Sequence, residues 1–359
     1  MLFRRLGARQ WQNPTRMRRL AKIAGLTAAA AALGLAAERT LVASPRYRGP
    51  VTDHFDGERF HNHQSGWQTE GSFLKWQMTK KPGPWRKWIE SQSGPKPETR
   101  VDDGRVRVTW VNHATMLVQL DGVNILTDPI WSERCSPVSF AGPKRHRAPG
   151  LRFEDLPPID AVLVSHNHYD HLDLPTLKRL GGTRIFTPLG NSALMAKHGV
   201  GGATDFDWWQ EAPLTDRVKV TLVPAQHFCA RGMSDRNHTL WGGFVISGPS
   251  GNVYFAGDTG WGKHFAEIGE KFGAIRVALL PIGAYLPRWF MKSAHISPDE
   301  AIDAHAALRA RTSIAMHYGT FRLGDDGETE PVDDLKKALA AKGNAPVLVV
   351  EHGRGIDVP

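Results

Sequence analysis

The sequence predicts an α/β protein in which two mixed β-sheets pack face to face between helical layers, an αββα sandwich. Strand pairs joined by tight turns come first, and strands that alternate with helical segments follow them. Tight turns join antiparallel strands, whereas a helix between two strands favours a parallel pair. With 41% hydrophobic and 23% charged residues, the 359-residue chain has an ordinary globular composition and can bury a substantial core.

Composition divides the chain into three segments. We expect residues 1–45 to be a leader, residues 46–104 an irregular extension that wraps the body, and residues 105–359 the main domain. The extension is rich in Pro, Gly, Trp and His and shows little periodicity. We expect its tryptophans to anchor it on the body: Trp67, Trp76, Trp85 and Trp88.

The leader carries the net positive charge of the chain. Residues 1–50 hold ten Lys and Arg against one Glu, a net charge of +9 that equals the charge of the whole protein. The neutral body therefore gives no reason to expect a nucleic-acid partner. Arg16, Arg18, Arg19 and Lys22 precede the apolar run Ile23–Ala37, a pattern typical of a secretory signal or an anchor. We expect a membrane-associated, exported protein, with a body on the cytoplasmic face or a plain basic tail as alternatives.

In the main domain, residue periodicity indicates the individual elements. Alternation from Val106 to Trp110 and from Met116 to Leu120 predicts half-buried strands, and Asp121-Gly122 predicts a hairpin turn. Further strands are expected at Val123–Leu126, Ala161–Val164, Arg184–Thr187, Val218–Val223, Phe244–Ser247, Val253–Ala256, Val277–Pro281, Ser313–Met316 and Val347–Val350. Helices are expected at Leu174–Leu180, Ser192–His198, His264–Phe272, Pro298–Arg309 and Asp333–Ala341. Ser297 is a good helix cap, with Pro298 at the first position and Glu300 three residues after the cap.

The segment after the strand Ala161–Val164 carries most of the chemistry. It contains His166, His168, Asp170 and His171 within six positions. Imidazole is a preferred ligand of zinc and related metals, and a carboxylate compensates the charge of the ion. His227, Asp258 and His317 also follow predicted strands, whose ends can converge on one point. A histidine-rich surface loop is the alternative, but it would not require these three additional residues.

These seven residues resemble the ligand set of the metallo-β-lactamase superfamily. The resemblance implies two zinc ions, one held by His166, His168 and His227 and the other by Asp170, His171 and His317. Asp258 would bridge the two ions. Asp128 resembles an early aspartate that supports a liganding histidine from outside the ligand set.

A narrower resemblance extends from about Val108 to Gly353. The segments Leu126–Ile130, Gly142–Arg145, Pro281–Lys292 and His317–Phe321 look like those of the N-acylphosphatidylethanolamine-hydrolysing phospholipase D family. The resemblance implies a phosphodiesterase that releases N-acylethanolamine and phosphatidic acid from a phospholipid at a membrane surface. It places Tyr169 and His295 on the substrate. Asp170 would orient the nucleophile, and His295 would bind phosphate or assist the leaving oxygen.

Two other functions remain open. One is a different hydrolase built on the same site, either a lactonase of the ascorbate-phosphate type or a nucleotide phosphodiesterase. The other is an inactive, membrane-attached zinc-binding module. At single residues, His295 could instead be a surface-loop histidine, Tyr169 could be a packing residue, and His113 is expected to be structural.

Overall fold

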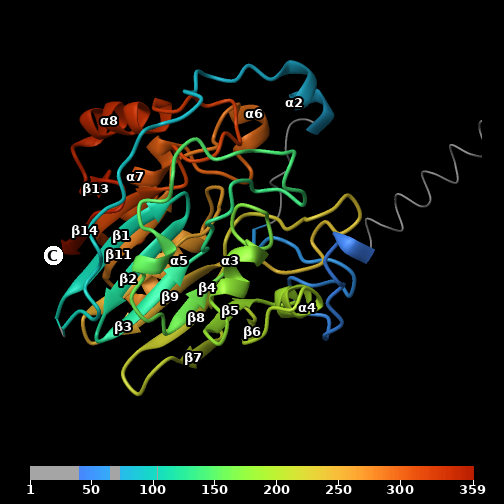
Figure 1. The fold of residues 1–359 in the computed structure, drawn as a ribbon, viewed down its shortest axis with the longest axis horizontal. Helices are drawn as coiled ribbons and strands as arrows, with labels where there is room; N and C mark the ends of the chain where they lie inside the picture. Colours follow the sequence, from blue (N-terminus) through green and yellow to red (C-terminus); the bar gives the residue numbers. More distant parts are fainter. Residues whose placement is uncertain (1–39, 65–72, 103) are drawn as a thin grey trace, which may run out of the picture.

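The computed structural model describes residues 40–64, 73–102 and 104–359, and it confirms the predicted sandwich of two mixed sheets (Figure 1). The first sheet has seven strands in the order β14-β1-β2-β3-β4-β5-β6. They are β1 (Val106–Asn112), β2 (Thr115–Leu120), β3 (Val123–Thr127), β4 (Ala161–Leu163), β5 (Arg184–Pro188), β6 (Ala203–Phe206) and β14 (Gly355–Val358). Pairing is antiparallel from β14 to β3 and parallel from β3 to β6.

The second sheet has the same mixed plan, with seven strands in the order β13-β12-β11-β10-β9-β8-β7. They are β7 (Glu211–Pro213), β8 (Lys219–Val223), β9 (Gly243–Gly248), β10 (Gly251–Phe255), β11 (Ile275–Pro281), β12 (Ala310–Met316) and β13 (Val347–Leu348). The pairs from β7 to β10 are antiparallel, and those from β10 to β13 are parallel. The short strands β6, β7 and β14 were not expected, and β13 is shorter than predicted.

Helices cover the outer faces of the sheets. Leu177 of α3 (Leu174–Arg179) and Leu194 of α4 (Asn191–Lys197) share a core with Val162 of the first sheet. Helices α5 (His264–Phe272) and α7 (Pro298–Ala307) pack with the second sheet, and α8 (Glu330–Lys342) packs on α7. All five were predicted. The capping box of α7 is present, with the Ser297 side chain accepting from the backbone N–H of Glu300.

Strand direction determines where the functional residues meet. Strands β1, β3 and β4 run the same way, because β2 is antiparallel to both β1 and β3, and β4 is parallel to β3. Likewise β8, β10 and β12 run the same way. Polar residues that follow these strands therefore gather at the carboxyl ends of the two sheets.

The N-terminal extension lies against the body through specific contacts. Its first half buries Phe55 and Phe60, and His54 Nε2 lies 2.7 Å from Asp207 Oδ1. In its second half, Trp76 donates to Asp325 Oδ1 at 3.0 Å and Trp85 donates to the Asp326 carbonyl at 2.9 Å.

Two of the four expected tryptophan anchors are therefore present. Trp88 is 42% exposed and is not an anchor, and Trp67 lies outside the described residues. The extension also contains an unexpected helix, α2 (Phe73–Thr79). Trp76 of α2 stacks on Phe290 of another unexpected helix, α6 (Arg288–Met291), at 5.1 Å between ring centroids. Phe290 therefore helps to hold the extension on the body.

The predicted leader falls almost wholly on residues 1–39, outside the described residues. Within the part of the chain that the structure describes, no helix has the length and apolar character needed to span a bilayer.

Candidate metal centre

Three imidazoles meet at the carboxyl ends of β4 and β8. His166 and His168 come from the loop after β4, and His227 from the segment after β8. His168 Nδ1 lies 2.9 Å from His166 Nε2 and 3.3 Å from His227 Nε2. The geometry lets these three nitrogens share one cation, as the sequence predicted.

Asp170, His171 and His317 form a second group beside the first. Asp170 Oδ2 lies 3.2 Å from His171 Nε2 and 3.5 Å from His317 Nε2. Both imidazoles are buried, and the Asp170 side chain is only 13% exposed. The structure thus brings together the three residues expected at the second cation.

Asp258 lies between the two groups. Its Oδ2 atom is 3.1 Å from His171 Nε2, 3.9 Å from His227 Nε2 and 4.0 Å from His166 Nε2. Its Oδ1 atom is 3.1 Å from His317 Nε2. One carboxylate therefore approaches rings of both groups, which is the position required of a bridge.

Asp128 supports this cluster from behind. It follows β3, is fully buried, and accepts from the backbone N–H and hydroxyl of Ser165 at 2.7 and 2.6 Å. Its Oδ2 atom lies 2.5 Å from His171 Nδ1. This contact directs His171 Nε2 towards Asp170 and Asp258, which agrees with the supporting role that the resemblance implied for Asp128.

Burial and neighbouring charges shift the pKa values of several groups in the cluster in opposite directions. Burial lowers the pKa values of His166 and His227 well below their usual range, so both rings are neutral and able to ligate. Burial alone would raise the pKa of Asp258, but His171, His317 and His295 outweigh it and hold that pKa well below normal. Burial would lower the pKa of His317, yet Asp258 and Asp170 raise it to about 9. The carboxylates of Asp170 and Asp258 are therefore ionised, and positive charge beside them stabilises this state.

The cluster contains buried polar atoms that have no hydrogen-bond partner and that metal ions could bind. His171 Nε2, His317 Nε2 and Asp258 Oδ1 are buried and have no hydrogen-bond partner. Buried polar atoms without partners are costly, and such atoms commonly mark a ligand or an ion. His171 Nε2 lies 3.1 Å from Asp258 Oδ2, and His317 Nε2 lies 3.1 Å from Asp258 Oδ1, an arrangement that suits ligands around shared cations.

The two expected substrate residues have different surroundings. The His295 ring is 13% exposed, and its Nδ1 atom is 3.8 Å from Asp258 Oδ2 without a hydrogen-bond partner. His295 is therefore close enough to join His227 and Asp258 around an ion, although the sequence placed it outside the ligand set. Tyr169 contacts the Arg231 guanidinium, 3.8 Å from the ring centroid, and lines a cavity of about 840 Å³.

His113 is a site residue that the sequence reasoning missed. Its Nε2 atom lies 2.9 Å from Asp170 Oδ2, and its ring centroid is 4.0 Å from that of His317. His113 follows β1 at the same edge of the sheet as the other candidates, and this placement after a strand could have identified it. The structure places it where it can orient Asp170 or ligate beside it.

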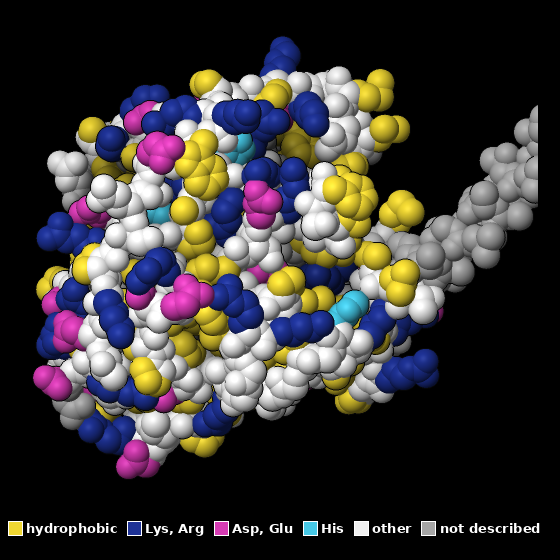
Figure 2. Space-filling view, in the orientation of Figure 1, with side chains coloured by type: hydrophobic (Ala, Val, Ile, Leu, Met, Phe, Trp, Pro, Cys, Tyr) yellow, Lys and Arg dark blue, Asp and Glu magenta, His cyan; other side chains and the backbone are white. Residues whose placement is uncertain are grey.

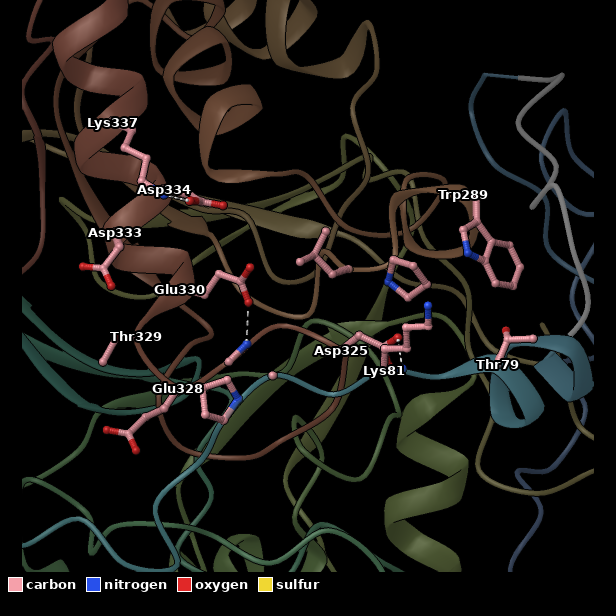
Figure 3. Close-up of a pocket in the computed structure, with 15 residues that line it drawn as sticks. Thr79, Lys81, Trp289, Asp325, Glu328, Thr329, Glu330, Asp333, Asp334 and Lys337 are labelled. Carbon is pink, nitrogen blue, oxygen red and sulfur yellow. Dashed lines mark hydrogen bonds and ion pairs between the residues drawn. The ribbon is translucent and has the colours of Figure 1, made fainter.

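A separate pocket of about 770 Å³ lies between α8, α6 and the extension (Figure 3). Figure 3 shows Glu330, Asp333 and Asp334 on one side of this pocket and Trp289 on the other. None of the candidate ligands lines the pocket in the described part of the chain. Its lining has five carboxylates against Lys81 and Lys337, which disfavours an anionic phosphodiester.

Residues 123–318, more than half of the chain, match the family described as the β-lactamase superfamily domain. The chain belongs to the metallo-β-lactamase superfamily. A solved relative, the metallo hydrolase Igni18 from Ignicoccus hospitalis, is 26% identical and superimposes with a TM-score of 0.53. That alignment covers 71% of this chain and 99% of Igni18.

Curated relatives within the superfamily indicate the kind of enzyme. N-acyl-phosphatidylethanolamine-hydrolyzing phospholipase D 1 of Caenorhabditis elegans is 45% identical, over 65% of this chain and 70% of the relative. The mitochondrial enzyme of the same description in Saccharomyces cerevisiae is 33% identical, over 64% of this chain and 50% of the relative. A metal-dependent hydrolase of Methanopyrus kandleri, MK1542, is 32% identical, over 70% of this chain and all of that protein. The chain is thus an enzyme, a metal-dependent hydrolase of the metallo-β-lactamase superfamily.

Proposed function

We propose that the chain is a zinc-dependent phosphodiesterase of the phospholipase D type, with two zinc ions. Its substrate is N-acylphosphatidylethanolamine, and its products are N-acylethanolamine and phosphatidic acid. The similarity to the Caenorhabditis elegans enzyme, at 45% identity, is the observation that carries the choice of substrate. The seven candidate ligands exceed what one tetrahedral zinc site uses, which supports two ions.

The seven candidate ligands would hold two cations, which would supply Lewis acidity for a displacement at phosphorus. The chain's own residues position the reactants. Asp170, held by His113 Nε2 at 2.9 Å, orients the attacking water. His295 has an unpartnered ring nitrogen beside Asp258, and it meets the phosphate or the leaving oxygen. Water is the nucleophile, so one oxygen of the product phosphate comes from water and the P–O bond to the ethanolamine breaks.

The cavity beside Tyr169 suits an amphipathic anion. Its lining includes the apolar Val138 and Leu174 and the basic Arg134, Lys178 and Arg231. Apolar walls can hold an acyl chain, while the cations offset a phosphate. Tyr169, which lines this cavity, stands between the candidate ligands His168 and Asp170, so one loop contributes to both the cavity and the metal centre.

The surface around this cavity supports a membrane as the partner. Phe140 and Met233, within two residues of the cavity lining, are 81% and 83% exposed. The α2 residues Phe73, Leu74 and Met78 are also exposed. Arg134 lines both this cavity and a neighbouring pocket whose lining includes Phe73. Over α2, Figure 2 shows hydrophobic side chains at the outer edge with Lys and Arg beside them. Exposed apolar and basic side chains together suit an interface with anionic lipid.

A phospholipid panel tests this function. We expect vesicles that contain N-acylphosphatidylethanolamine to yield N-acylethanolamine, with oxygen-18 from labelled water appearing in the phosphatidic acid by mass spectrometry. Chelation should abolish turnover and added zinc should restore it. Lactone opening or nucleotide diester cleavage without phospholipid hydrolysis would contradict the proposal and favour one of the other hydrolases. Inactivity on the whole panel at full zinc occupancy would favour the zinc-binding module.

We also propose that the leader exports or anchors the protein. The basic residues before Ile23–Ala37 are the support for this proposal. Residues 1–50, fused to a reporter that is active only outside the cytoplasm, should give reporter activity. A fusion with Arg16, Arg18, Arg19 and Lys22 replaced by Glu is the control. Activity confined to a cytoplasmic reporter would make residues 1–45 a plain basic tail.

A further inference from the structure

The backbone of His227 lies in a segment without regular structure. Strand β8 ends at Val223, so the N–H and carbonyl of His227 have no partners from a sheet ladder. Buried backbone groups need such partners. On the side chain, Nδ1 lies 2.9 Å from the Ala294 carbonyl, which leaves Nε2 facing His168 and Asp258. A backbone shift at His227 would therefore move a candidate ligand atom.

The partner of this backbone is Asn62 of the N-terminal extension. Its Oδ1 atom accepts from the His227 N–H at 2.9 Å, and its Nδ2 atom donates to the His227 carbonyl at 2.9 Å. Trp241 Nε1 also donates to Asn62 Oδ1, at 3.1 Å. A single amide thus satisfies both backbone groups of His227, which requires a donor and an acceptor in one planar side chain.

Asn62 is itself held on both sides. The fully buried Phe60 donates from its backbone N–H to the Asn237 carbonyl at 2.9 Å, and Asn237 Nδ2 donates back to the Phe60 carbonyl at 3.0 Å. On the other side, His63 Nε2 lies 2.7 Å from Glu267 Oε2 of α5. The asparagine is therefore fixed to the body from two directions, so it can set the position of His227.

We propose that Asn62 is a positioning residue for the metal ion held by His166, His168 and His227. The N-terminal extension would then contribute to the metal centre, because its Asn62 side chain fixes the position of His227. The inference rests on the two-ion centre proposed above and is independent of the substrate. Residues that orient metal ligands from outside typically change metal affinity about 10- to 100-fold when replaced.

Metal release from the zinc-loaded full-length enzyme tests the inference. Asn62→Ala removes both hydrogen bonds to His227, and Asn62→Asp keeps the acceptor but loses the donor to the carbonyl. With an excess of a chromogenic chelator whose absorbance reports the zinc that it captures, we expect one ion to leave about 10- to 100-fold faster in both variants. The other ion should leave at the wild-type rate. Circular dichroism shows which variants are folded, and the conservative Asn62→Asp decides the question if Asn62→Ala does not fold.

Asn124→Ala is the matched control. Asn124 also joins the extension to the body, since its Nδ2 atom donates to the Thr99 carbonyl at 2.9 Å and to the Pro158 carbonyl at 2.8 Å. It contacts no candidate ligand through these bonds, so both ions should leave at the wild-type rate even if the melting temperature falls. Unchanged release in a folded Asn62 variant would overturn the proposal. Equal acceleration of both ions, or the same acceleration in Asn124→Ala, would reduce Asn62 to general stability and also overturn it.

Discussion

We expect the replacement of Asp258 by Asn to release both of the proposed metal ions and to abolish hydrolysis. The two carboxylate oxygens lie 3.1 Å from His171 Nε2 and His317 Nε2, and Oδ2 is also within 4.0 Å of His166 and His227. Asparagine has the same shape but no charge, so neither of the two proposed cations would have an anionic ligand at this position. Because Asp258 is a candidate ligand of both ions, we expect a loss of metal affinity beyond the roughly 10- to 100-fold typical of a supporting residue.

Zinc content per chain, measured by elemental analysis of unstripped protein, checks this result together with turnover. Asp205→Asn is the control: Asp205 accepts from the backbone N–H groups of Gly190 and Ser192 and has no place in the metal centre. This variant should retain both ions. If Asp258→Asn loses one ion and keeps the other, Asp258 is a ligand of a single site and not the bridge.

Much of the metal centre was predictable because strand direction and ligand type act together. His166, His227, Asp258 and His317 each follow a buried strand. Strands β8, β10 and β12 run the same way in the second sheet, and the loop after β4 of the first sheet meets the end of β8. Because these strands are buried, their residues are mostly apolar, and they can be recognised in the sequence as short apolar runs. Metal-binding side chains are also rare enough in such positions to stand out.

Other parts of the site could not be read in the same way, because they depend on contacts distant in sequence. Asn62 meets His227 across 165 positions, and no local pattern marks an asparagine whose partner is a backbone. Short edge strands such as β7 lack enough residues to show a period. Helix α2 was missed because its seven residues are fewer than the roughly 11 to 18 over which a helical period can be recognised.

For His295, the sequence and the structure suggest different roles. The sequence placed it on the substrate, outside the ligand set. The structure holds its backbone through Met291 and Arg288 and brings Nδ1 to 3.8 Å from Asp258 Oδ2. Burial lowers the pKa of His295 to about 4, so the ring is neutral near pH 7. A neutral imidazole can ligate a metal or donate one hydrogen bond to a phosphate oxygen.

His295→Ala separates these roles, and we expect hydrolysis of N-acylphosphatidylethanolamine to slow about 10²- to 10⁴-fold with both zinc ions retained. The reason is that a side chain which touches the reacting phosphate acts on the transition state, whereas the seven other candidates suffice to hold the ions. Zinc content and turnover are measured on the same sample, with His305→Ala as the control, because His305 lies on α7 and bonds Ser313 away from the centre. Loss of one ion in His295→Ala would make His295 an eighth ligand. Full activity would show that His295 takes no part in the reaction. The phosphate contact would then have to come from another side chain that can donate a hydrogen bond, such as Tyr169 or Arg231 in the lining of the cavity.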